Sequence, residues 1–206
     1  MQKNYKTFIE WIAVIAIISF LIIHCVIRRC CEEGIQWGWE SIWGDIGYTT
    51  LFVGFLAFLF NRFMWRNPHI GKLFHTPFLQ GEWEGKGYSS YNDQDFACTL
   101  KIKQTFLQTH VHAIFEKSES RSFCSVFIHD DISDKTILVY SYQNDPKLVY
   151  RNKSEKGVES GLNIHYGSTM LDVDFDDLTH LSGTYWNDRT YIGTLELTKK
   201  SKINGK

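Results

Sequence analysis

Two long apolar stretches occupy the first third of the chain, and a region of alternating apolar and polar residues follows them. Residues 11–27 contain no Asp, Glu, Lys or Arg, and the second apolar run starts at Ile46. At about 1.5 Å per residue, a helix of either length approaches the ~30 Å thickness of a bilayer's hydrocarbon core. We therefore predict a transmembrane helical hairpin over residues 1–66, with spans at about residues 9–27 and 46–65.

A cleaved signal peptide or a buried helical hairpin are the alternatives to two membrane spans. The first stretch is long for the apolar part of a signal peptide, and Glu10 precedes it. Arg28 and Arg29 follow it, where a signal peptide has small residues for cleavage. These features favour a retained double anchor.

Basic residues beside the two spans predict the orientation of the hairpin. Arg28 and Arg29 lie in the connecting loop, and more basic residues flank the outer ends: Lys3, Lys6, Arg62, Arg66 and Lys72. Because positive charge stays on the cytoplasmic side, we expect both termini to be cytoplasmic. Trp37, Trp39 and Trp43 in the loop suit the interfacial belt of aromatic residues. His24 lies inside the first span, where it either packs or lines a pore.

The rest of the chain predicts β-structure. Prolines in residues 67–77 indicate a linker, and residues 78–206 form the second domain. Phe96, Cys98, Leu100 and Ile102 alternate with Ala97, Thr99, Lys101 and Lys103, which is the period of a half-buried strand. The pattern recurs about every ten residues and predicts eight strands, at 81–89, 95–104, 107–116, 121–129, 135–142, 162–174, 181–186 and 189–198.

Short polar turns separate these predicted strands. Asn187 and Asp188 form a two-residue hairpin signal, residues 130–134 form a second turn and residues 144–146 a third. Residues 147–161 read as a longer, mobile loop. With no sustained helical periodicity, residues 78–206 are expected to form an all-β, roughly eight-stranded antiparallel up-and-down barrel of the lipocalin or streptavidin kind.

Composition narrows the function. The 206 residues carry a formal net charge of −1, so the chain lacks the basic surplus that favours DNA or RNA polymers. Its five cysteines show neither zinc-ligand spacing nor a disulfide framework, and we expect mostly reduced thiols.

A small barrel can hold one small ligand at its mouth, and the candidate ligand groups lie on its last hairpin. Tyr185, Trp186, Asn187 and Arg189 combine aromatic rings, an amide and a guanidinium, which suits a phosphorylated aromatic ligand. The alternative is a solvated turn with a salt bridge between Asp188 and Arg189.

Catalytic signals are weak. His110 and His112 share a strand face, but no third metal ligand follows at a recognisable spacing, and no serine lies in a nucleophile motif. We expect no metal, no catalytic residues and no enzymatic activity.

The order of parts resembles a known family. Two transmembrane helices before a β-barrel resemble the two-transmembrane β-barrel effectors of bacterial CBASS antiphage defence. The matching motifs are Tyr140-x-Tyr142-x-Asn144-x-Pro146, His165-x-Gly167, Leu181-x-Gly183-x-Tyr185-Trp186-Asn187-x-Arg189 and Gly193-x-Leu195-x-Leu197, with a looser Gly81-x-Trp83.

The resemblance implies a partner nucleotidyltransferase that makes a 3′,3′-linked cyclic oligonucleotide, with a cyclic dinucleotide expected. On this resemblance, the barrel is expected to bind this activating ligand without any other cofactor, and the protein is expected to oligomerise. Its helices are then expected to contact lipid and disrupt the inner membrane, so that the infected cell dies by abortive infection.

Seven residues are the expected ligand contacts. Aromatic rings suit bases, and basic side chains suit phosphates, with Arg151 as a weaker candidate. The predicted set is Trp83, Lys101, Tyr142, His165, Tyr185, Asn187 and Arg189. Two alternatives remain: a membrane-tethered, lipocalin-like carrier of a small apolar ligand, and a membrane-bound hydrolase that places His110, His112 and a carboxylate around a metal.

Overall fold

The computed structural model describes residues 3–27, 39–91, 93–151 and 163–200. The chain divides into two compact units, Met1–Phe74 and His75–Lys206. The division falls inside the segment in which the sequence predicts a linker.

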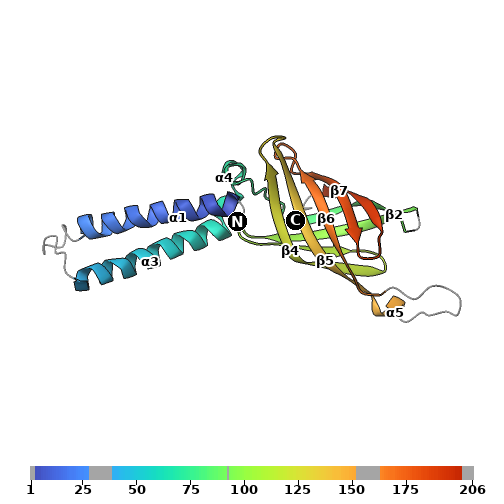
Figure 1. The fold of residues 1–206 in the computed structure, drawn as a ribbon, viewed down its shortest axis with the longest axis horizontal. Helices are drawn as coiled ribbons and strands as arrows, with labels where there is room; N and C mark the ends of the chain where they lie inside the picture. Colours follow the sequence, from blue (N-terminus) through green and yellow to red (C-terminus); the bar gives the residue numbers. More distant parts are fainter. Residues whose placement is uncertain (1–2, 28–38, 92, 152–162, 201–206) are drawn as a thin grey trace, which may run out of the picture. The chain divides into compact units, whose positions relative to one another are not determined.

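Two long helices make up most of the first unit. Helix α1 (Lys3–Ile22) continues into a π-helical turn, η1 (Ile23–Ile27), and lies beside α3 (Trp39–Arg62) (Figure 1). Two segments, Lys6–Cys25 and Ile42–Arg66, are long and apolar enough to cross a membrane, with mean hydropathies of 2.4 and 1.5. Few of their residues are buried in the protein, so most of their apolar surface is available to lipid. This composition indicates membrane association.

One end of the helical hairpin is held by aromatic packing. The Phe8 ring stacks on Phe60 at a centroid distance of 5.1 Å, and Phe74 meets Phe60 edge-on at 5.4 Å. Phe74 follows a short 3-10 turn, η2 (Met64–Arg66), and a helix, α4 (Pro68–Leu73).

Helix α4 differs from the sequence prediction, in which Pro68 only stops a helix. Pro68 instead lies in the first turn of α4, where the missing N–H costs nothing. The Asn67 side chain caps the helix by accepting a hydrogen bond from the His69 N–H at 3.0 Å.

The other end of the hairpin is held by a polar pair. His24 Nδ1 lies 2.7 Å from Asp45 Oδ2, and both side chains are buried. The pair joins the end of the first helical segment to the beginning of α3. His24 therefore packs within the hairpin.

Replacing Asp45 with Asn is expected to lower the free energy of unfolding of the hairpin by about 1 kcal/mol, because interhelical polar contacts in membranes average roughly that value. The loss should appear as a lower midpoint of helical circular dichroism when the full chain is heated in detergent. Glu10→Gln is the control. Glu10 is exposed, and its carboxylate lies 3.9 Å from the Lys6 ammonium of the same helix, so the pair does not join the two helices. Equal midpoints for the two variants would contradict a stabilising role for the buried pair.

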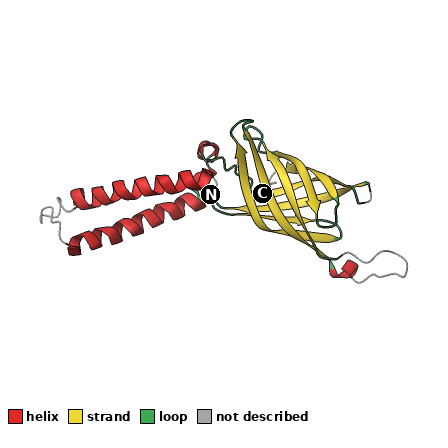
Figure 2. Cartoon of the chain, in the orientation of Figure 1, coloured by secondary structure: helices red, strands yellow, loops and turns green. Residues whose placement is uncertain are grey.

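The second unit is a closed barrel of eight antiparallel strands (Figures 1 and 2). Each strand pairs with the next, and β1 pairs with β8 to close the barrel. The strands are β1 (Gly81–Ser89), β2 (Gln94–Gln104), β3 (Thr109–Ile114), β4 (Ser118–Asp130), β5 (Lys135–Pro146), β6 (His165–Val173), β7 (His180–Asn187) and β8 (Ile192–Lys199). The predicted fold class is confirmed.

Apolar side chains fill the interior at the end where β1 begins. We call the buried residues there the floor: Leu79, Trp83, Ile102 and Gln104. The Gln104 amide ties the incoming chain to the floor, because it accepts from Leu79 N–H and donates to the Pro77 carbonyl, both at 2.9 Å. The barrel is therefore closed by packed side chains at this end.

Two turn predictions are wrong. Residues 144–146 continue β5, since Pro146 is the last residue of the strand. Asn144 follows Tyr142 by two residues and therefore faces the barrel interior, as Tyr142 does. The β7–β8 connection spans residues 188–191 rather than the two residues Asn187 and Asp188, so Arg189 lies in the turn. Leu148–Arg151 forms a short helix, α5, and residues 152–162 of the predicted loop lie outside the described residues.

Candidate functional site

Inward-facing side chains change from apolar to polar along the barrel axis. Strand pairing places Asn144 between Ser120 and His165, and two residues deeper it places Gly167 between Tyr142 and Asn187. We call the inward-facing residues at this end of the barrel the polar end: Ser118, Ser120, Tyr142, Asn144, His165, Tyr185 and Asn187. The polar end lies opposite the floor.

Glycines on neighbouring strands make room for two tyrosine rings of the polar end. A Cβ on Gly167 would lie 2.4 Å from the Tyr142 hydroxyl, and one on Gly193 would lie 2.4 Å from the Tyr185 ring. Burial raises the pKa of both tyrosines, so they remain neutral hydroxyls that can donate hydrogen bonds. The Tyr185 ring, which is only partly buried, offers a flat apolar face of the kind on which nucleobases stack.

Arg189 joins His165 of the polar end through the backbone carbonyl of Asn163. The Arg189 guanidinium donates to the Asn163 carbonyl oxygen at 2.7 Å, and His165 Nδ1 lies 3.3 Å from the same atom. Burial, together with the positive charge of Arg189, lowers the pKa of His165. The site therefore combines a permanent cation with a neutral imidazole.

Asn187 shapes the turn that carries Arg189. Its side-chain oxygen accepts from the backbone N–H groups of Arg189 and Tyr191, at 3.0 and 3.1 Å. Both bonds are internal to the turn, as in an Asx turn. Asn187 therefore positions Arg189.

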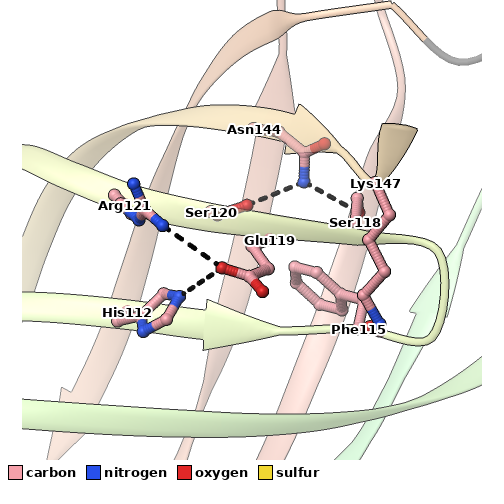
Figure 3. Close-up of polar contacts among 8 residues, drawn as sticks. All are labelled: His112, Phe115, Ser118, Glu119, Ser120, Arg121, Asn144 and Lys147. Carbon is pink, nitrogen blue, oxygen red and sulfur yellow. Dashed lines mark hydrogen bonds and ion pairs between the residues drawn. The ribbon is translucent and has the colours of Figure 1, made fainter. Parts of the chain in front are cut away.

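Asn144 is a site residue that the sequence prediction missed. Figure 3 shows its amide nitrogen donating to Ser118 and Ser120, at 3.1 and 2.8 Å. Its Oδ1 is buried and has no hydrogen-bond partner within the described part of the chain. Such an acceptor costs about 1–3 kcal/mol unless water or a ligand satisfies it. The alternation of Tyr140, Tyr142 and Asn144 was the signal that could have placed it inside.

The structure places the two other predicted contacts away from the polar end. Lys101 lies on the outer face, where its ammonium is 3.2 Å from a Glu82 carboxylate oxygen. Trp83 belongs to the floor, where its indole N–H donates to the Leu79 carbonyl at 2.9 Å. Five of the seven predicted residues therefore come together: Tyr142, His165, Tyr185, Asn187 and Arg189. The side chain of Arg151, the weaker candidate, lies outside the described part of the structure.

The histidines considered for a hydrolase lie on the outer face of β3. His112 Nε2 is 3.0 Å from Glu119, which also contacts Arg121 at 3.4 Å (Figure 3). Neither His110 nor His112 belongs to a group of three potential metal ligands among the residues that the structure describes. The arrangement is an ordinary surface ion pair.

A groove of about 510 Å³ lies outside the barrel, on the outer face of β1, β6, β7 and β8. Its lining is rich in acidic residues, among them Asp172, Asp174, Asp177 and Glu196. The barrel interior at the floor is filled by side chains with no exposed surface, such as Leu79 and Trp83. Neither place offers the apolar cavity that a lipocalin-like carrier needs.

Comparison with known proteins identifies the barrel. The family described as Cap15, cyclic dinucleotide receptor domain, matches residues 74–199, which is more than half of the chain. The chain belongs to the Cap15 family. The matched residues of this chain begin before β1 and end at the last residue of β8, so they include all eight strands of the barrel.

Relatives agree with this assignment. CD-NTase-associated protein 15 of Staphylococcus schleiferi is 27% identical over 191 residues, which cover 92% of each chain. The protein of the same name from Yersinia aleksiciae is 28% identical over 162 residues, covering 77% of this chain and 72% of the relative. The Cap15 family, to which this chain belongs, is associated with CBASS and carries a cyclic dinucleotide receptor domain. The predicted resemblance is confirmed.

Proposed function

We propose that this protein binds a 3′,3′-linked cyclic dinucleotide at the polar end of its barrel and acts as a membrane-disrupting CBASS effector. The observation that carries the proposal is the grouping of Arg189, His165, the buried Tyr142 and the partly buried Tyr185 at the end opposite the floor. A cyclic dinucleotide has two bases and two phosphates, and this end offers partners for both.

Each group has a defined part in the proposed complex. Arg189 binds a phosphate through paired N–H donors, since a guanidinium matches phosphate geometry. Tyr142 and Tyr185 stack on or border the bases. The buried Oδ1 of Asn144 accepts a hydrogen bond from a base N–H, which removes the cost of leaving it unsatisfied.

The helical hairpin supplies the effector part. A ligand shifts an assembly equilibrium only if it binds the assembled state more tightly. A Cβ added at Gly47 or Gly54 of α3 would meet nothing within 4 Å, so no described residue of this chain covers either glycine. Small residues on a lipid-facing surface allow close helix contacts between copies. The expected location is the inner membrane, with both termini cytoplasmic.

The proposal is tested with the full chain purified in detergent. It is titrated with a panel of cyclic di- and trinucleotides, with a linear dinucleotide as control, and oligomer size is followed by light scattering. Binding of a cyclic dinucleotide with growth of the oligomer supports both parts. Absence of binding across the panel overturns the receptor site, and binding without assembly overturns the effector step.

Affinity for the cyclic dinucleotide is expected to rise as pH falls from about 8 to about 6. In the free protein burial holds the pKa of His165 below its ordinary value, so the imidazole is neutral. A bound phosphate raises that pKa, so the complex takes up a proton and binding tightens at lower pH, by up to about tenfold.

Binding titrations across this pH range, on the natural chain and on His165→Gln, measure the effect. The variant should show a flatter pH profile. A natural chain whose affinity falls with decreasing pH would contradict the assignment of His165 to the phosphate-binding group.

A further inference from the structure

A second cluster of potential ligands lies at the end of the barrel where the floor is. His75 is the first residue of the second unit, His129 is near the end of β4, and Asp131 follows in the β4–β5 turn. One ligand atom of each residue lies within 4.8 Å of the others. The two imidazole rings stack with centroids 3.6 Å apart and planes inclined by 16°.

His129 is oriented by a hydrogen bond on the far side of its ring. Its Nδ1 lies 3.0 Å from the hydroxyl of Thr136, a buried residue on the adjacent strand. Its Nε2 lies 3.6 Å from Asp131 and 3.7 Å from Asp134. When Nδ1 donates its proton to Thr136, Nε2 directs a lone pair toward the carboxylates, which is the usual arrangement of a metal-bound histidine.

The backbone holds both sides of the cluster in an uncommon conformation. His75 has a φ of 47° and Asp134 a φ of 53°, in the left-handed region that non-glycine residues enter only when their surroundings require it. The chain entering the barrel and the β4–β5 turn are thereby brought to the same point. His75 is 54 positions before His129 in the sequence, so its juxtaposition with the β4–β5 turn comes from the fold.

We propose that His75, His129 and Asp131 bind a divalent transition-metal ion of the zinc class. Two imidazoles and one carboxylate are the ligand types that zinc takes, whereas calcium and magnesium prefer oxygen ligands alone. Water or the exposed carboxylate of Asp134 completes the coordination. The imidazole rings turn out of their stacked arrangement so that both lone pairs converge on the ion.

The bound ion ties the first residue of the barrel unit to the β4–β5 turn. Phe74, the residue before His75, ends the unit that contains the apolar helices. The ion therefore fixes the start of the barrel unit against the β4–β5 turn. This site is separate from the polar end and does not depend on nucleotide binding.

The test uses the tag-free full chain in detergent, stripped of metal with a chelator and titrated with Co²⁺. We expect the visible absorption of four-coordinate Co²⁺ at about one ion per chain, and its loss when Zn²⁺ is added. His75→Phe keeps a ring for stacking but removes the ligand nitrogen, and should weaken binding by about tenfold or more. Asp131→Asn, at a turn position, should weaken it as well.

His180→Phe is the matched control, since His180, the first residue of β7, also lies beside a carboxylate, 2.7 Å from Asp177. It should leave Co²⁺ binding unchanged. Circular dichroism and thermal midpoints of all variants without metal show whether the barrel is intact. The proposal is overturned if the natural chain gives no such absorption, or if folded His75→Phe binds Co²⁺ as tightly as the natural chain.

Discussion

Replacing Trp83 with Ala is expected to lower the free energy of unfolding of the barrel by about 3–5 kcal/mol, the usual cost of truncating a buried Trp. Trp83 has no exposed surface, and its indole N–H donates to the Leu79 carbonyl. The ammonium of Lys199 lies 5.2 Å from its ring. The substitution therefore leaves a cavity in the floor and an unsatisfied carbonyl, and it removes one of the aromatic rings, beside that of Phe78, that the half-buried Lys199 ammonium contacts.

Denaturant unfolding followed by the β-sheet signal in circular dichroism measures this loss. Trp186→Ala is the matched control, because Trp186 lies on the outer face of β7 and is 43% exposed. Its expected cost is below about 1 kcal/mol. If Trp83→Ala unfolds like the natural chain but loses nucleotide binding, Trp83 contacts the ligand, as the sequence alone suggested, and does not stabilise the floor.

The strands were predictable because one face of each is buried. Period-two alternation fixes which residues face inward, and the prediction for β1, residues 81–89, coincides with the observed strand. The end of β5 was missed because Asn144, Asp145 and Pro146 have strong turn preferences. Tertiary pairing overrides those preferences, since Pro146 pairs with Ser118 at the last position of the ladder.

The candidate site was predictable in part for the same reason. The alternation of inward and outward residues predicts that four side chains on neighbouring strands face the interior. They come together once the strands pair in order: Tyr142, His165, Tyr185 and Asn187. The alternation does not predict how far along the barrel axis a residue lies. The sequence alone therefore could not show that Trp83 lies at the floor and not at the polar end. The outer position of Lys101 was already implied, because the alternation that turns Leu100 inward turns Lys101 outward.

Long-range proximity was the part that no local pattern contains. The orphaned acceptor of Asn144 depends on serines of β4, more than twenty residues away. The cluster of His75, His129 and Asp131 depends on how the chain enters the barrel. Both features arise because the barrel closes. Local periodicity predicts that a barrel forms, but it does not predict which distant residues meet in it.

Replacing Arg189 with Ala is expected to weaken binding of the cyclic dinucleotide by about 10- to 100-fold, since a charge-assisted hydrogen bond contributes roughly 1.5–3 kcal/mol. The guanidinium is held near His165 by its bond to the Asn163 carbonyl, so it is oriented before the ligand arrives. The turn should survive the substitution, because Asn187 accepts from the backbone N–H of residue 189 and not from its side chain.

Binding titrations on three matched variants separate a specific phosphate contact from general electrostatic attraction. Arg121→Ala removes the same side chain from the outer face, where Arg121 contacts Glu119, and should leave affinity unchanged. Lys101→Ala should do the same, because Lys101 pairs with Glu82 on the outer face. Arg189→Lys keeps the charge but loses the two-pronged geometry, so its affinity should fall between those of the natural chain and Arg189→Ala. Equal losses in Arg121→Ala and Arg189→Ala would mean that overall charge, rather than the polar end, attracts the ligand.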